Sequence, residues 1–446
     1  MYNANRKDWF RPRSYIHFDE KITEHKRAWV TQFVSNPANV SRHPFFPFLY
    51  YLKQKSKVET SEDGKREYKS GARPICYAAH LDAHVYAYYS NLLSEVYEER
   101  LNREGLSEHV IGFRKLKDAD GNAKSNIHLA NDAFKAIRDL GDCRVYAFDI
   151  KSFFSSLEAR HLKKAWKDLL STDELPKDHF NVFKSLVSYR LVQRDELFRQ
   201  LRIPKSAKEQ RKQNIDRVCS AKFYREFLVE KTEIVGKGIP QGSPISATLA
   251  NLYMLSFDGI VAKKVTAKAG FYFRYCDDLL VALPAKEDFD VETFICDQLA
   301  LIGLKLNPHK TDISTFFRVG GKTSFDKPIQ YLGFVFDGTV ISIRPGSISG
   351  YLRDLKKSVN QAMAIKLSKD RESKFCKDHE VSLKGVLEHY SQHNERTFLS
   401  YVRRAADVMN SDGVRSQYNR LTRLFDAHMR RAKKLNPKKP SQRPSL

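Results

Sequence analysis

The spacing of apolar residues along the chain predicts a mixture of helices and strands. From Leu81 to Tyr97, apolar side chains recur at helical spacing, at positions 81, 85, 88, 89, 92 and 96, which predicts an amphipathic helix. Residues 144–149 (RVYAFD) have the apolar content of a strand that runs into a helix. Residues 271–283 (FYFRYCDDLLVAL) predict two short apolar strands around a Cys-Asp-Asp turn.

Beyond about residue 350 the apolar pattern is helical. Three apolar stripes at helical spacing are formed by Leu352, Leu355 and Val359, by Phe398, Val402, Ala405 and Met409, and by Leu421, Leu424 and Phe425. A strand-rich middle with helices on either side predicts an α+β protein that ends in a helical domain.

The charge of the chain indicates a class of partner. The sequence holds 77 Lys and Arg against 53 Asp and Glu, a formal net charge of +24. Such an excess favours a polyanion, because each phosphate contact releases condensed counterions; an anionic membrane surface or a ribosome would also suit it. The stretch from Arg190 to Lys231 is rich in Lys and Arg and fits either a solvated face or a nucleic-acid groove. Residues 431–446 contain no acid and predict a flexible basic tail that contacts RNA.

Targeting and cysteine patterns predict a cytoplasmic protein without a membrane span. The first residues (MYNANRKDWF) are polar and basic, unlike a secretory signal, and no apolar run approaches about 20 residues. The six cysteines are scattered without a C-x-x-C pair, so reduced thiols are expected. His80 and His84 stand four residues apart on the predicted helix, but no third ligand is nearby, so ordinary helix histidines are favoured over a zinc site.

Two short segments place acidic residues at the ends of predicted strands. Asp149, in FDIKSFF (148–154), would by itself be read as a turn residue or helix N-cap. Asp277 and Asp278, in YCDD (275–278), repel each other unless a cation neutralises them, although a surface turn would also tolerate them. Three aspartates on neighbouring strand ends can hold two Mg²⁺ ions about 3.5–4 Å apart. One ion would lower the pKa of a primer 3′-hydroxyl, and the other would neutralise charge on the leaving pyrophosphate.

A glycine- and proline-rich loop lies between these two acidic segments. Residues 236–254 (GKGIPQGSPISATLANLYM) predict a loop that leads into an apolar helix. Glycines allow close approach of the backbone to a ligand, and Gln241 could contact a nucleotide or a template base. An ordinary Gly-Pro loop before a packed helix remains the alternative at this point.

Seven short segments, in order, resemble the motifs of reverse transcriptases. They are GARPI (71–75), IGFRK (111–115), Phe148–Leu157, Gly238–Met254, Tyr275–Leu280, GLKLNPHKT (303–311) and YLGF (331–334). The resemblance spans roughly residues 60 to 340 and is strongest to retron, group II intron and defence-associated bacterial enzymes. Cys276 stands where retron and intron enzymes usually have Ala. This favours the defence-associated "unknown group" class, and overall likeness favours type 2 within it.

The resemblance implies a role for each matching site residue. Asp149, Asp277 and Asp278 would bind the two metal ions, Mg²⁺ with Mn²⁺ as a substitute, assisted by the carbonyl of Ile150. Phe154 would be the steric gate, whose ring clashes with a ribose 2′-hydroxyl and so selects dNTPs.

The remaining motif residues would contact the nucleotide. Arg73 would hold the triphosphate, Gln241 would line the nucleotide pocket, and Lys310 would act near the leaving pyrophosphate. Ser152 stands where many relatives have an acidic residue, so its role is open.

The resemblance also implies a right-hand polymerase fold. The expected parts are an N-terminal extension (1–60), fingers (61–140), a palm (141–340) with a basic helical segment at about 190–231, a helical thumb (341–430) and the basic tail (431–446).

The implied function is RNA-directed DNA polymerisation by two metal ions, on a dedicated non-coding RNA, in antiviral defence. Expected partners are this RNA, the cDNA product and dNTPs. The alternatives are a retron-type enzyme that makes branched RNA–DNA, a template-independent or protein-primed polymerase, and an RNA-binding scaffold on a polymerase fold. An intact aspartate triad argues against the scaffold, since binding alone does not require clustered carboxylates.

Overall fold

The computed structural model describes residues 9–60, 66–228, 232–320, 322–367 and 383–434. Helices and strands alternate along this part of the chain and form three separate sheets, which confirms the predicted α+β class. Most of the predicted basic tail, from residue 435 onward, lies outside the described residues. Within the described residues, no helix combines the length and apolar character needed to span a bilayer.

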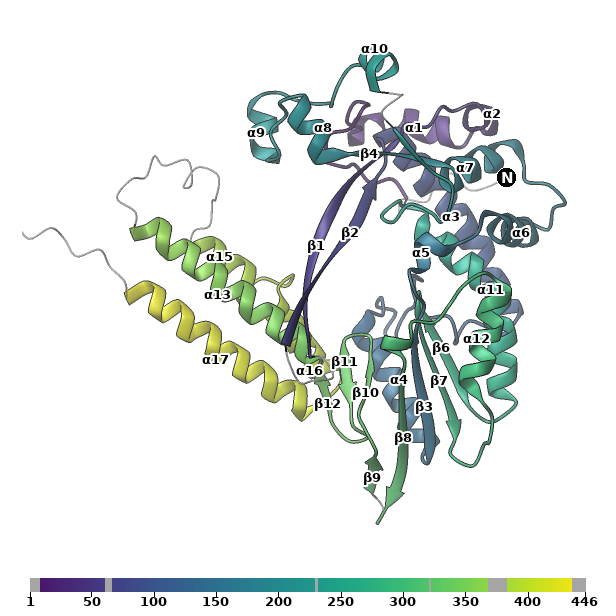
Figure 1. The fold of residues 1–446 in the computed structure, drawn as a ribbon, viewed down its shortest axis with the longest axis vertical. Coiled ribbons are helices and arrows are strands. Elements are labelled where there is room, and N and C mark those ends of the chain that lie inside the picture. The colour runs from purple at the N-terminus through teal and green to yellow at the C-terminus, as the bar shows by residue number, and fades with distance from the viewer. Residues whose placement is uncertain (1–8, 61–65, 229–231, 321, 368–382, 435–446) are drawn as a thin grey trace, which may run out of the picture.

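A four-stranded sheet contains a long hairpin near the N-terminus. Its strand order is β2-β1-β4-β5, with β1 Phe48–Thr60, β2 Arg66–Tyr77, β4 Tyr189–Gln193 and β5 Glu233–Val235. Strands β1 and β2 pair antiparallel along their length, whereas β1 and β4 pair parallel over three residues only. In the view of Figure 1 the hairpin runs from the N-terminal helices toward the C-terminal ones.

Helices lie around one end of this sheet (Figure 1). The longest, α3 (His80–Arg103), contains the predicted helix from Leu81 to Tyr97; the stripe is buried at positions 85, 88 and 89 and half-buried at 81, 92 and 96. The segment from Arg190 to Lys231 folds as β4 followed by short helices, as far as it is described. The other helices of this part are η1 Glu24–Lys26, α1 Arg27–Val34, α2 Pro37–Ser41, α6 Ala159–Leu170, α7 Lys177–Val187, α8 Arg194–Gln200, α9 Ala207–Lys212, α10 Ala221–Phe223 and η2 Tyr224–Leu228.

A five-stranded antiparallel sheet lies at the centre of the chain. Its order is β6-β7-β3-β8-β9, with β3 Cys143–Asp149, β6 Phe271–Tyr275, β7 Asp278–Pro284, β8 Asp312–Val319 and β9 Lys322–Phe325. The strands predicted at 144–149 and 271–283 are therefore confirmed.

Both faces of this sheet are covered by helices. Successive residues of β3 point to opposite faces, so Val145 and Ala147 share a core with α4 (Asn126–Leu140). Tyr146 and Phe148 share the other core with α11 (Ser246–Thr266) and α12 (Val291–Leu301). Helices on both faces explain why the strands read as continuous apolar runs.

The C-terminal part consists of a small sheet and helices. The sheet is formed by β10 Ile329–Tyr331, β11 Phe334–Phe336 and β12 Ile341–Ile343, and the helices are α13 Pro345–Leu367, α15 Leu383–Tyr390, α16 Phe398–Val408 and α17 Asp412–Lys434. The predicted helical C-terminal part is confirmed for the described residues. Figure 1 shows α13, α15 and α17 projecting away from the central sheet.

Candidate active site

Three aspartates meet at one end of the central sheet. Strands β3 and β7 pair in a register that sets Asp149 opposite Asp278. The turn between β6 and β7 consists of Cys276 and Asp277, with Cys276 in the left-handed region at a φ of 60°. The backbone N–H of Ile150 donates to the carbonyl of Asp277 over 3.0 Å. The register and this bond bring together the acidic segments that the sequence singled out.

The carboxylates lie in an electrostatically unfavourable place. Burial, together with the neighbouring carboxylates of Asp277 and Asp149, raises the pKa of Asp278 to about 7 against the opposing charges of Lys310 and Arg344. Burial also raises the pKa of the Cys276 thiol, which therefore stays protonated. Three carboxylates whose charges oppose one another, all hard oxygen donors, fit a divalent cation.

Lys310 holds the first of these aspartates. Its Nζ lies 2.7 Å from Oδ1 and 2.9 Å from Oδ2 of Asp149. Asn307 donates to the same residue twice, from its backbone N–H to the carbonyl over 2.7 Å and from Nδ2 to Oδ2 over 3.2 Å. Both residues belong to the segment around η4 (Pro308–Lys310). Within the described ranges, no three His, Cys, Asp or Glu side chains are arranged to hold a metal ion as they stand. To bind a metal ion, the Asp149 carboxylate would have to lose its ion pair with Lys310.

The loop that precedes α11 packs closely against the segment that follows Asp149. That segment forms the short helix α5 (Phe153–Ser156), and the half-buried Phe154 accepts a bond at its carbonyl from the N–H of Ile239 over 2.9 Å. A Cβ on Gly238 would lie 2.5 Å from the Cα of Ser155, so only glycine permits this approach. The loop position is thereby fixed relative to Phe154.

The same loop contacts the long hairpin. Arg73 Nε donates to Gln241 Oε1 over 2.6 Å, and the N–H of Cys76 donates to the carbonyl of Gln241 over 2.8 Å. Gly242 has a φ of 114°, and a Cβ there would lie 2.4 Å from the Cys76 carbonyl oxygen. Arg73 of β2 and Gln241 of the loop are therefore in direct contact, and the same loop also donates the bond from Ile239 to Phe154.

Other polar residues that the sequence reasoning did not select support the site. Arg274, Asp258 and Asn251 form a fully buried network behind the Cys-Asp-Asp turn. An arginine in the otherwise apolar strand FYFRY was the available signal, since a buried charge requires a partner.

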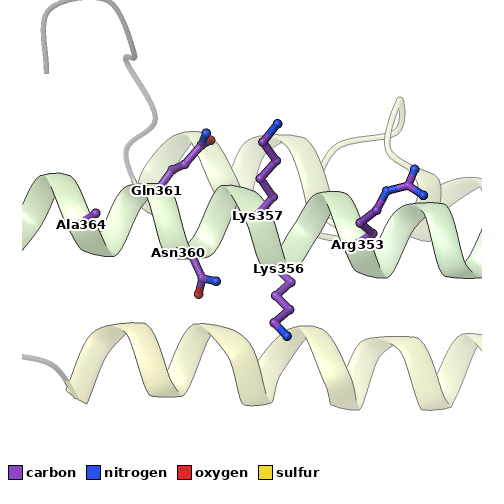
Figure 2. A pocket seen from close by; sticks show the side chains of 6 residues that line it. All are labelled: Arg353, Lys356, Lys357, Asn360, Gln361 and Ala364. Atoms are coloured by element: carbon purple, nitrogen blue, oxygen red, sulfur yellow. The ribbon is translucent and has the colours of Figure 1, made fainter. Parts of the chain in front are cut away.

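A hollow along α13 does not involve the predicted site residues. It has a volume of about 470 Å³ and opens widely to solvent along α13, where it is lined by Arg353, Lys356, Lys357, Asn360, Gln361 and Ala364. Figure 2 shows Lys356 and Asn360 pointing toward α17, and Arg353, Lys357 and Gln361 pointing away from it. It is an exposed basic surface rather than an enclosed pocket.

The chain belongs to the family of reverse transcriptases (RNA-dependent DNA polymerases), whose family model matches residues 63–336. The match includes every predicted site residue. The protein is therefore an RNA-directed DNA polymerase, of a family that uses divalent metals. No curated protein sequence matches the chain.

Among solved structures, the chain is similar to telomerases. Telomerase from Candida albicans, in complex with a TWJ fragment of telomeric RNA, is 13% identical with a TM-score of 0.37, and the match covers 93% of this chain and 71% of that one. Apo telomerase from Candida tropicalis truncated from its C-terminal domain is 9% identical with a TM-score of 0.41, covering 73% and 61%. Apo telomerase from Candida tropicalis is 12% identical with a TM-score of 0.38, covering 93% and 64%. The chain thus spans less than two thirds of the two Candida tropicalis chains.

Proposed function

We propose that this polymerase adds dNTPs to a primer 3′-hydroxyl with Asp149, Asp277 and Asp278 as the ligands of two divalent metal ions. The observation that carries the proposal is the β3–β7 register, which sets Asp149 opposite Asp278 and beside the Cys276–Asp277 turn. Mg²⁺ suits these hard oxygen donors, and Mn²⁺ can substitute. Bound metal would activate the primer hydroxyl and neutralise charge on the pyrophosphate.

The chain's own residues would bind and orient the substrates around this centre. The carbonyl of Ile150 completes the ligand set, and the ring of Phe154 occupies the space that a ribose 2′-hydroxyl would need. Arg73 binds the triphosphate, with Gln241 holding its guanidinium in place and lining the nucleotide pocket. Lys310, now paired with Asp149, would be displaced from it by a bound metal ion and would then be placed to face the leaving pyrophosphate.

The parts of the fold are assigned accordingly. Residues 1–60 form an N-terminal extension, 61–140 the fingers, 141–340 the palm, 341–430 the thumb and 431–446 a basic tail. The exposed cations of α13 would then face the nucleic acid from the thumb.

We also propose a biological role: the template is a dedicated non-coding RNA, and the DNA product serves antiviral defence in the cytoplasm. This proposal is supported by the sequence likeness to defence-associated bacterial enzymes and by the net charge of +24, which favours a stable RNA complex.

The test is to express the gene with its native flanking DNA, purify the protein, and sequence the RNA and DNA bound to it. An Asp277→Ala/Asp278→Ala variant is purified alongside. One discrete RNA with both proteins, and complementary DNA with the wild type alone, supports the proposal. Equal RNA and no DNA with either protein, even during phage infection, would replace it with the binding-scaffold alternative. A 2′,5′ linkage would indicate retron-type priming, and DNA joined covalently to protein would indicate protein priming.

A further inference from the structure

A fully buried ion pair lies directly behind the catalytic turn. Arg274 is the fourth residue of β6, Asp258 lies on α11, and both side chains have 0% exposure. Nε of Arg274 donates to Oδ1 of Asp258 over 2.7 Å, and Nη2 donates to Oδ2 over 2.6 Å. The hydroxyl of Tyr272 donates to the same Oδ1 over 2.7 Å. One carboxylate thus holds two of the three guanidinium nitrogens in place.

The third nitrogen of this guanidinium reaches the turn itself. Nη1 of Arg274 donates to the carbonyl of Cys276 over 3.3 Å and to Oδ1 of Asn251 over 3.0 Å. Because the peptide unit is planar, holding the Cys276 carbonyl also fixes the direction in which Asp277 leaves the turn. Cys276 adopts a φ of 60°, a conformation that costs free energy for a residue with a Cβ and needs surrounding support.

The same network holds the turn from its other side. Asn251 Nδ2 donates to the carbonyl of Gly112 over 2.9 Å. Gly112 packs so tightly on the turn that a Cβ would lie 2.7 Å from the N atom of Cys276. The N–H groups of Ile111 and Gly112 both donate to the carbonyl of Arg274, over 2.9 and 3.2 Å. One buried network therefore connects α11, the 111–112 segment and the Cys276–Asp277 turn.

Stability alone gives no reason for an ion pair at this place. Removing both charges from water is costly, and apolar residues of similar volume often replace such a pair with no loss of stability. An apolar pair could not donate to the Cys276 carbonyl. We propose that Arg274, oriented by Asp258 and Asn251, is a positioning residue that fixes the catalytic turn and so the carboxylates of Asp277 and Asp278. This inference deepens the proposed function and rests on it.

The test compares the wild type with an apolar variant, Asp258→Leu/Tyr272→Phe/Arg274→Met, which removes both buried charges and the Tyr272 hydroxyl together. The matched control is Lys268→Met/Glu287→Leu, which removes a half-buried ion pair of 2.9 Å between the segment after α11 and the connection from β7 to α12. Three quantities are measured: thermal unfolding, direct Mn²⁺ binding by titration calorimetry, and kcat and KM for dNTP in primer extension.

We expect the apolar variant to unfold within a few degrees of the wild type, with Mn²⁺ affinity and kcat each lower by about 10- to 100-fold, as for outer-shell partners of metal ligands. KM for dNTP should change much less, and the control should match the wild type in all three. An apolar variant that binds Mn²⁺ and extends primers as the wild type does would overturn the proposal.

If the apolar variant does not fold, the Asn251→Ala variant provides the test. It removes the bonds from Asn251 to Arg274 Nη1 and to the Gly112 carbonyl but keeps the ion pair. A several-fold loss of Mn²⁺ affinity and kcat supports positioning, and unchanged values overturn it. An Arg274→Lys variant should lose less Mn²⁺ affinity and kcat than the apolar variant, since it keeps the positive charge but not the guanidinium geometry. Failure of the proposed function looks different: the wild type itself would not extend primers, or Asp277→Ala/Asp278→Ala would still do so.

Discussion

Phe154 is the residue expected to decide which sugar is accepted. Its carbonyl is tied to Ile239, and its ring meets Phe153 edge-on at 5.6 Å, so backbone and ring are both held in place. We expect Phe154→Ala to raise incorporation of GTP relative to dGTP by about 10- to 100-fold, because the space for a 2′-hydroxyl opens. Single-nucleotide primer extension measures this ratio. Phe154→Tyr keeps the bulk and should keep the discrimination; equal ratios for the alanine variant and the wild type would remove Phe154 as the gate.

Lys310 links Asp149, a proposed metal ligand, to the segment after α12. Because its ammonium lies against both oxygens of Asp149, it competes with a metal ion for that carboxylate. The Lys310→Gln variant should therefore bind Mn²⁺ at least about threefold more tightly in the absence of nucleotide. Its rate of nucleotide addition should nevertheless fall to about one tenth of the wild-type rate or below, since the cation near the pyrophosphate is lost. Titration calorimetry and primer extension measure the two effects.

The matched control for this change is Lys305→Gln. Lys305 is exposed in the same segment, and its backbone carbonyl accepts the bond from Lys151. The control should behave as the wild type. Weaker Mn²⁺ binding by Lys310→Gln would mean that Lys310 supports the metal site instead of competing for it.

At the scale of elements, the loop before α11 holds together the residues that are proposed to bind the nucleotide. Gly242→Ala would place a Cβ 2.4 Å from the Cys76 carbonyl oxygen at a φ of 114°. The loop must then move away from β2, which separates Gln241 from Arg73. We expect KM for dNTP to rise by about tenfold or more. Gly236→Ala is the control, because a Cβ at Gly236 meets nothing within 4 Å. Similar kinetics for both variants would contradict this role of the loop.

The packing of the N-terminal segment on α3 should make the fold sensitive to acid. His17, His80 and His84 are all fully buried there. Burial lowers the pKa of His17 to about 3 and of His80 and His84 to about 4. Folded-state pKa values below the unfolded value of about 6.5 give stability that is complete above pH 6.5 and is lost as the pH falls toward 4. Asp19 and Asp82 oppose this, since burial raises the pKa of Asp19 to about 6 and also raises the pKa of Asp82, but they are two groups against three.

Thermal unfolding at pH 7.5 and pH 5.0 measures this acid sensitivity. The wild type should lose several degrees at pH 5.0, and His80→Phe should lose less, because Phe can keep the stacking on Tyr15 without a titrating nitrogen. His25→Gln, a change at an exposed histidine on η1, should leave the pH dependence as in the wild type. An unchanged pH dependence in His80→Phe would exclude this histidine as a source.

The elements that the sequence predicted are those with local apolar periodicity. The helix α3, the strands β3, β6 and β7, and the C-terminal helices all follow from spacing within the segment itself. The β1–β2 hairpin was not predicted, because the sequences of its strands mix polar and apolar residues without a regular period. Its parallel contact with β4 joins residues about 140 positions apart, such as Phe48 and Leu191, which no local pattern encodes.

The candidate site likewise contains some features that the sequence predicts and others that only the folded chain shows. Asp277 and Asp278 could be selected because adjacent carboxylates between apolar strands are unusual, and Asp149 could be selected through its combination with them and the motif resemblance. The structure brings their segments together. The bond from Lys310 to Asp149 and the network around Arg274 depend on which side chains meet after folding. Asn251 and Asp258 lie seven residues apart on one face of α11, and their partner Arg274 is on another element, so only the folded chain pairs them.

For the whole molecule, the net charge of +24 predicts that RNA is bound largely through its phosphates. The logarithm of the affinity should fall linearly with the logarithm of the salt concentration, with a slope of about −0.7 for each phosphate that a single strand contributes. With about six phosphates bound, the affinity for a single-stranded RNA should fall by more than about 100-fold between 50 and 200 mM salt. Filter binding or fluorescence anisotropy gives the slope.

Two variants locate this charge on the molecule. Lys357 is exposed beside the hollow on α13 and points away from α17 (Figure 2). The Lys357→Gln variant should therefore have a shallower salt dependence, by nearly the contribution of one phosphate contact. Lys286→Gln, in the exposed connection between β7 and α12, removes the same charge and should leave the slope unchanged. Asp277→Ala/Asp278→Ala should also keep the wild-type slope, because the carboxylates serve the chemistry and not the phosphate contacts. Equal effects of Lys357→Gln and Lys286→Gln would mean that the RNA responds to the total charge and has no preferred path along α13.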